Sequence, residues 1–135
     1  MKVTIEANQG TYKVRVIESK ALLIVFRLIT TLGIFYPLTT GTVGITLSRW
    51  ILINPGLMFE TVNGNQFYSA TARHEFIHVV QQRETGFILF VLRYFYYFLK
   101  TRSYAKIPFE REAYTHQDEQ YYLLKRNKND WRNYE

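Results

Sequence analysis

Two histidines four positions apart, in the segment His74-Glu75-Phe76-Ile77-His78, are the side chains whose types and spacing best suit chemistry. On a helix, such residues point from one face in successive turns, so both imidazoles can reach one zinc ion at roughly 2.0–2.1 Å. Glu75 is turned by about a hundred degrees from His74, which keeps its carboxylate off the metal but beside the open ligand position. The spacing predicts a zinc-dependent peptidase, a hydrolase in which zinc lowers the pKa of water to about 7 and Glu75 is the general base.

The residues around this segment argue against a surface helix that carries two histidines by chance. Val79 and Val80 continue the apolar character of Phe76 and Ile77, so the helix is expected to be mostly buried. Buried histidines need polar partners, and two of the three histidines in the chain fall at ligand spacing. We therefore expect His74 and His78 to bind Zn2+.

A catalytic zinc site needs a third protein ligand, which must come from a later element. Residues 79–84 contain neither a glycine nor a third histidine, so the ligand is not in the next turn of the helix. The candidates are Glu110, Glu112 and His116. Both glutamates also suit a role without metal, as first-turn charges that the helix dipole favours.

The segment Ile107-Pro108-Phe109-Glu110-Arg111-Glu112-Ala113-Tyr114 resembles the second motif of gluzincin peptidases. In that motif a helical glutamate binds zinc, and a small residue one turn later lets two helices approach closely. The resemblance implies that Glu110 is the ligand and Ala113 the small residue, with Glu112 as the alternative and His116 as a third choice. Tyr114 stands where the family has an aspartate that orients the first histidine, which leaves the partner of His74 open.

A wider resemblance covers about half of the chain. The strand-like segment from Thr42 to Asn54, together with His74–His78 and the following Val79-Val80-Gln81-Gln82, resembles the metallopeptidase domain of extracellular contractile injection system and phage-like proteins. It implies an α+β, zincin-like fold with a small twisted sheet, a backing helix, the HExxH active-site helix and a C-terminal glutamate-bearing helix. In such folds an edge strand beside the zinc commonly binds the substrate, and residues 50–54 are the segment that would do so here; the alternative is that this strand is part of the core.

The periodicity of the remaining residues predicts elements that fit this fold. Residues 1–18 alternate as a β-hairpin, 21–36 form a largely buried helix, and 42–54 form a third strand. A polar link at 61–66 precedes a helix that Ser69 or Thr71 caps and that Gly86 ends. Further helices are expected at 87–99 and about 110–126, and a frayed tail at 127–135.

Composition limits the function classes. A chain of 135 residues with 47% apolar residues is expected to form one domain, 1–135, and the lack of cysteine excludes disulfides, cysteine-ligated zinc and a cysteine nucleophile. Residues 1–18 do not resemble a secretory signal, so a cytoplasmic or peripherally membrane-associated protein is expected.

The charge balance bears on partners. Lys and Arg outnumber Asp and Glu by 17 to 11, which favours anionic surfaces. Besides a peptide or protein substrate, the apolar helices and these charges suggest contact with a membrane surface; binding to nucleic acid, supported by charge alone, is not expected. The alternative function is a membrane- or virion-associated module whose zinc site is structural or vestigial.

Overall fold

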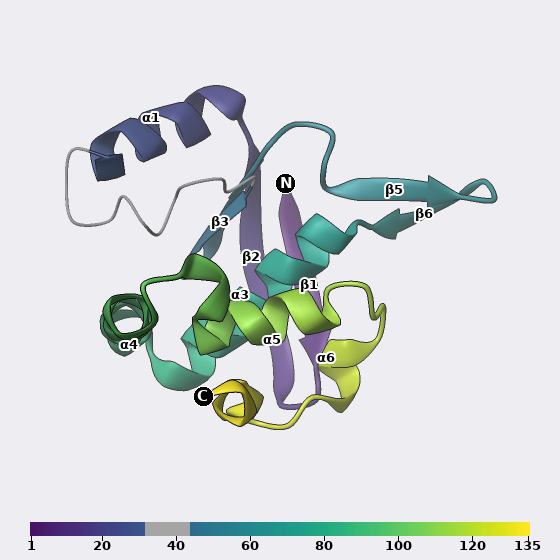
Figure 1. The fold of residues 1–135 in the computed structure, drawn as a ribbon. Coiled ribbons are helices and arrows are strands. Elements are labelled where there is room, and N and C mark those ends of the chain that lie inside the picture. Colours follow the sequence, from purple (N-terminus) through teal and green to yellow (C-terminus); the bar gives the residue numbers. More distant parts are fainter. Residues whose placement is uncertain (32–43) are drawn as a thin grey trace.

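The computed structural model describes residues 1–31 and 44–135, which form an α+β fold (Figure 1). A four-stranded sheet has the strand order β1-β2-β4-β3, and β5 and β6 form a separate two-stranded sheet. Helix α3 lies across one face of the larger sheet, and α5 packs on α3 from the other side (Figure 1). The predicted metal-binding helix is therefore at the centre of the molecule.

The N-terminal hairpin is confirmed. Strand β1 (Lys2–Ala7) pairs antiparallel with β2 (Gly10–Glu18), and Ala7 is opposite Gly10 at the turn. The apolar positions of the alternation, Val3, Ile5, Val14 and Val16, are buried against α3, as the period of two requires.

The prediction of a single third strand at 42–54 is wrong, because this segment contains two strands. Residues 44–53 form a hairpin of β3 (Gly44–Leu47) and β4 (Trp50–Ile53), joined by Ser48 and Arg49; residues 42 and 43 lie outside the described part. Ser48 makes the turn with a φ of 56°, a conformation that serine rarely adopts. Strand β4 pairs with both β2 and β3, so residues 50–54 are not an edge strand. The edge is β3.

Helix α3 (Ala70–Thr85) agrees with the sequence prediction at both ends. The Ser69 hydroxyl accepts a hydrogen bond from the Ala72 amide, and Gly86 ends the helix with a φ of 89°. Every residue from His74 to Gln82 is buried, including the charged and polar ones. Phe76 and Val79 face the sheet, whereas Ile77 packs against Ala113 of α5 (Pro108–His116).

One predicted helix is less buried than expected, and a second is buried on one face only. Helix α1 (Lys20–Thr31) was predicted to lie behind the sheet, yet Leu22, Ile24 and Val25 are exposed and only Leu23 is buried among its described side chains. The prediction for residues 32–36 lies outside the described part of the chain. Helix α4 (Phe87–Thr101) buries Phe90 and Tyr94 on one face and exposes apolar side chains on the other.

The remaining segments correct three predictions. The polar link is a hairpin of β5 (Phe59–Val62) and β6 (Asn65–Tyr68), whose turn residues Asn63 and Gly64 both have positive φ. The last helix is interrupted, because α5 ends at His116 and α6 covers only Tyr122–Lys125. The tail is ordered by a 3-10 helix, Asp130–Tyr134, since Trp131 is buried against Phe109. Within residues 1–31 and 44–135, no helix has the length and apolarity to cross a bilayer.

Candidate metal centre

Three side chains converge between α3 and α5. The Nε2 atoms of His74 and His78 lie 3.1 Å apart. Glu110, in the first turn of α5, places one carboxylate oxygen 3.1 Å from Nε2 of His74 and the other 3.2 Å from Nε2 of His78. All three side chains are buried, and this group could hold a metal ion.

The distances and the donor set fit zinc. Ligand atoms on a tetrahedral zinc ion, at bond lengths of roughly 2.0–2.2 Å, lie about 3.3 Å from one another. The three separations of 3.1 and 3.2 Å are close to that value. Two imidazoles and one carboxylate are ligands that zinc prefers, and three protein ligands leave one position for water or substrate.

Each histidine has a glutamine partner on its second ring nitrogen. Nδ1 of His78 is 2.8 Å from Oε1 of Gln81, and Nδ1 of His74 is 3.0 Å from Oε1 of Gln117. The Gln81 amide nitrogen donates to the Phe109 carbonyl and to a carboxylate, so its oxygen must face His78. Nδ1–H of His78 is therefore the donor, which leaves its Nε2 for the cluster.

The Glu110 carboxylate is held from a third direction by α4. The Tyr94 hydroxyl donates a 2.7 Å hydrogen bond to Oε1 of Glu110. Burial and the nearby Glu110 charge raise the pKa of Tyr94 well above its usual value, so the hydroxyl keeps its proton at neutral pH. Helix α4, whose role the sequence did not indicate, thus supplies a side chain that orients the glutamate.

The charges of the cluster depend on one another. Burial by itself would lower the pKa of His78, but the Glu110 carboxylate outweighs it and raises this pKa to about 9. Burial would likewise raise the pKa of the Glu110 carboxyl, but the charge of His78 and hydrogen bonds from both histidines hold it well below its usual range. Without a metal the site is thus a buried ion pair, and a bound cation would replace the proton of His78.

Glu75 lies outside the ligand group, as its position after His74 predicts. It is buried, and the Thr46 hydroxyl donates a 2.7 Å hydrogen bond to its Oε2. Gly44, two residues earlier in β3, leaves room for this carboxylate, because a Cβ there would be 2.9 Å from Oε1 of Glu75. Gln82 ties the helix to the same strand through the Thr46 carbonyl and the Ser48 amide. Strand β3 thus fixes the position of Glu75.

Glu112, the alternative third ligand, has a different set of partners. Its carboxylate forms a buried ion pair with Arg126 and accepts hydrogen bonds from Gln81 and the Tyr122 hydroxyl. Arg126 also pairs with Glu84 at 2.7 Å. The structure therefore brings Glu110, and not Glu112, to the two histidines.

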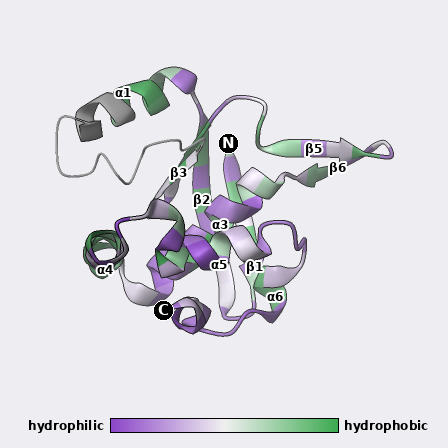
Figure 2. Ribbon diagram, viewed as in Figure 1, coloured by the Kyte–Doolittle hydropathy of each residue, from purple (hydrophilic) through white to green (hydrophobic). Residues whose placement is uncertain are grey.

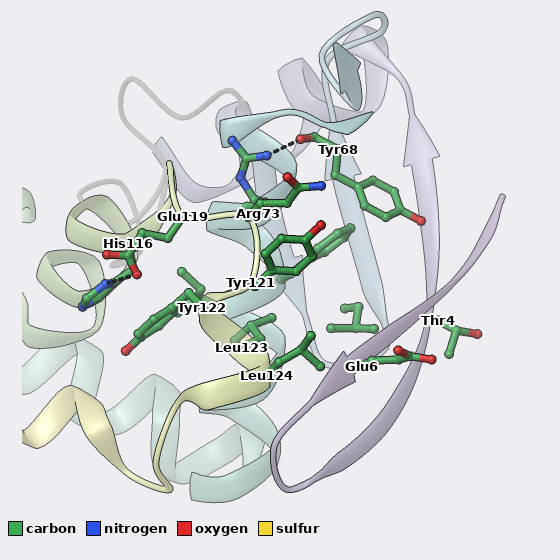
Figure 3. A pocket seen from close by; sticks show the side chains of 14 residues that line it. Thr4, Glu6, Tyr68, Arg73, His116, Glu119, Tyr121, Tyr122, Leu123 and Leu124 are labelled. Carbon is green, nitrogen blue, oxygen red and sulfur yellow. Dashed lines mark hydrogen bonds and ion pairs between the residues drawn. The ribbon is translucent and has the colours of Figure 1, made fainter. Parts of the chain in front are cut away.

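His116, the third choice, is also elsewhere. Its ring stacks on Tyr122 with centroids 3.8 Å apart, and its Nε2 contacts the Tyr134 hydroxyl. It lines a cavity of about 240 Å³ between β1, the start of α3 and the loop before α6 (Figure 3). None of His74, His78 and Glu110 lines this cavity, so it is separate from the candidate metal centre.

Two tyrosines lie near the centre. The Tyr114 ring contacts the His74 ring at a centroid distance of 4.5 Å, in place of the aspartate expected there. Burial and the charge of Glu110 raise the pKa values of both Tyr104 and Tyr114, so both hydroxyls are donors at neutral pH.

Five residues around the centre received no role from the sequence: Gly44, Thr46, Gln81, Tyr94 and Gln117. Gln81 and Gln117 are polar residues close to predicted ligands, but their type carries no sign of contact with a histidine. Gly44 and Thr46 precede the histidines by about thirty positions and reach Glu75 only through the packing of β3 on α3. No protein-family model, curated protein or solved structure matches this chain.

Proposed function

We propose that this protein is a zinc-dependent peptidase with a zincin-like fold. The observation that carries the proposal is the convergence of His74, His78 and Glu110 through atoms at ligand spacing, with a separate buried glutamate, Glu75, on the same helix. A buried ion pair alone would need neither two histidines with partnered Nδ1 atoms nor a second carboxylate beside them.

His74, His78 and Glu110 would hold the zinc ion, and Gln117, Gln81 and Tyr94 would orient these ligands. Bound zinc supplies a Lewis acid that polarises a carbonyl and lowers the pKa of water to about 7. The protein's own side chains would carry out the other parts of the reaction. In particular, the tight hydrogen-bonding of each ligand is what keeps the donor atoms turned toward one another.

Glu75 would be the general base. Its carboxylate would accept a proton from the attacking water and pass it to the leaving amine. The Thr46 hydroxyl, bound to Oε2, keeps this carboxylate in one orientation. Tyr104 and Tyr114 are the hydroxyl donors that could stabilise the negative charge developing on the scissile carbonyl oxygen.

A peptide or protein substrate would lie along β3. This strand is the edge of the sheet nearest Glu75, through Gly44 and Thr46, so an extended peptide added to it would pass beside the base. The role that the sequence analysis gave to residues 50–54 is thereby moved to residues 44–47.

The test is metal analysis and hydrolysis with the full chain. We expect about one zinc per chain, with Glu110→Gln losing the metal and Glu75→Gln keeping it. Cleavage of unfolded casein should fall at least about a hundredfold in Glu75→Gln. Glu60→Gln, at an exposed position of β5, is the control and should change neither quantity.

Two results would contradict the proposal. One is a purified protein that binds no zinc after dialysis against a zinc-containing buffer. The other is a casein-cleaving activity that Glu75→Gln leaves intact, since the reaction would then not use this carboxylate.

A further inference from the structure

Helix α4 has an exposed apolar stripe opposite its buried face. Ile88, Leu92, Tyr96 and Leu99 are exposed, Ile88 by 74% and Leu92 by 61%. At 3.6 residues per turn these four positions fall within an arc of about 80°. Continuous apolar stripes of this kind are uncommon on the free surface of a protein and indicate a binding surface.

Helix α1 has a similar surface. Leu22, Ile24 and Val25 are exposed although they belong to an amphipathic helix. Both helices lie on the side of the molecule away from β1 and α6 in the view of Figure 1, and Figure 2 shows hydrophobic colouring on each.

The charges of the chain are divided in the same way. The segments 19–59 and 85–109, which contain α1 and α4, have seven basic residues and no acidic residue. All other segments together have ten basic and eleven acidic residues, so the net charge of +6 comes entirely from the two segments that contain the apolar helices. A partner that is apolar and carries negative charge would complement this surface.

Basic and aromatic side chains adjoin the stripe directly. Lys100 is exposed, with its ammonium 6.0 Å from the ring centroid of Tyr96. Arg102 and Lys106 follow the end of the helix and are also exposed. Tyrosine and lysine at the border of an apolar surface are typical of helices that lie in the headgroup region of a bilayer.

We propose that α4 and α1 form a docking surface for a bilayer of anionic phospholipid. The apolar stripe of α4 enters the acyl boundary, and Lys100, Arg102 and Lys106 contact the headgroups. The opposite face of α4 carries Tyr94, bound to Glu110, and Phe90, whose ring lies 6.3 Å from that of His78. Docking therefore places the metal centre about one helix diameter, ~10 Å, from the lipid.

Vesicle flotation with the full chain tests this inference, independently of any peptidase activity. We expect the protein to float with phosphatidylcholine vesicles that contain about 30 mol% phosphatidylserine, and to be released as salt rises from roughly 0.1 to 0.5 M. Ile88→Gln with Leu92→Gln should abolish flotation. Lys100→Gln with Arg102→Gln should weaken it at least about fivefold.

Matched controls place the effect on this surface. Val62→Gln with Leu124→Gln removes two half-exposed apolar side chains elsewhere, and Lys125→Gln with Lys128→Gln removes two exposed charges outside the acid-free segments. Both controls should float as the unchanged protein does.

Three outcomes would overturn the inference. The first is no flotation at any lipid composition. The second is flotation that both control pairs weaken as much as the α4 pairs do. The third is a protein that does not float but sediments as a dimer that the Ile88/Leu92 pair makes monomeric, because the stripe would then bind a second copy of the chain.

Discussion

At the residue scale, two glutamates of α5 share a helix and a degree of burial but have unlike partners. Glu110 contacts His74, His78 and Tyr94, whereas Glu112 contacts Arg126. Side chains two residues apart on a helix differ in direction by about 200°, so the two carboxylates point to opposite sides of α5. One side faces the candidate metal centre and the other faces the C-terminal segment.

This difference predicts opposite phenotypes for two conservative variants. Glu110→Gln should lower zinc affinity at least about a hundredfold, because the negative ligand is lost. Glu112→Gln should lower the free energy of unfolding by about 3 kcal/mol, because the buried Arg126 keeps only Glu84 as a charged partner, and should lower zinc affinity far less than Glu110→Gln does. Zinc titration and urea unfolding of both proteins measure the two effects. Loss of zinc in folded Glu112→Gln would contradict the assignment of ligands.

The contact between Gln117 and His74 gives a second prediction at this scale. Gln117→Leu removes the acceptor of Nδ1–H and should lower zinc affinity about tenfold, since the ring is no longer held in one tautomer and orientation. Gln120→Leu, at an exposed position of the same loop, is the control. Competition with a zinc-binding dye measures the zinc affinity of each variant. Equal affinities in the two variants would show that Gln117 does not orient the ligand.

At the scale of elements, β3 connects the sheet to the proposed base. Gly44→Ala would place a Cβ 2.9 Å from Oε1 of Glu75 and must displace the carboxylate or the strand. We expect the rate of peptide hydrolysis to fall about tenfold or more with zinc content unchanged, because a misplaced base loses its alignment.

Initial rates and metal content, measured on one preparation of Gly44→Ala, separate an effect on the base from an effect on the ligands. Thr46→Val should act in the same direction through loss of the hydrogen bond, while Thr46→Ser keeps the hydroxyl and should retain most of the rate. A Gly44→Ala protein with full activity would mean that Glu75 has room that the structure does not show.

The elements also show how far sequence reasoning reaches. Helix α3 could be predicted with its caps, because Ser69, Gly86 and the apolar run between them are local signals. Asn63-Gly64 was an equally local hairpin signal that the interpretation as a polar link overlooked. The split of β3 from β4 was not predicted, since Ser48 alone is a residue typical of turns, Arg49 adds no such signal, and a φ of 56° is rare for serine.

The choice between Glu110 and Glu112 was undecidable for a similar reason. Both residues suit the first turns of α5, and only the rotation of that helix decides which one faces α3. Contacts from distant residues set this rotation: Arg126 binds Glu112, and Tyr94 binds Glu110. The tail shows the same limit, because its polar composition conceals the buried Trp131.

At the scale of the whole molecule, the candidate metal centre joins three consecutive helices, α3, α4 and α5. The ligands come from α3 and α5, and the residues that orient them come from α3, α4 and the loop after α5. A metal ion that binds only the folded chain must therefore stabilise the packing of these elements as one unit.

This coupling predicts how stability depends on zinc. At free zinc of about a hundred times the dissociation constant, the free energy of unfolding should rise by about 2.7 kcal/mol over the metal-free protein. Removal of zinc with EDTA should reverse the gain, and thermal unfolding with and without zinc measures it. The gain should be absent in Glu110→Gln and present in Glu75→Gln, because only the former removes a ligand. A stabilisation of equal size in both variants would mean that zinc binds elsewhere on the chain, and would remove the basis for placing it between α3 and α5.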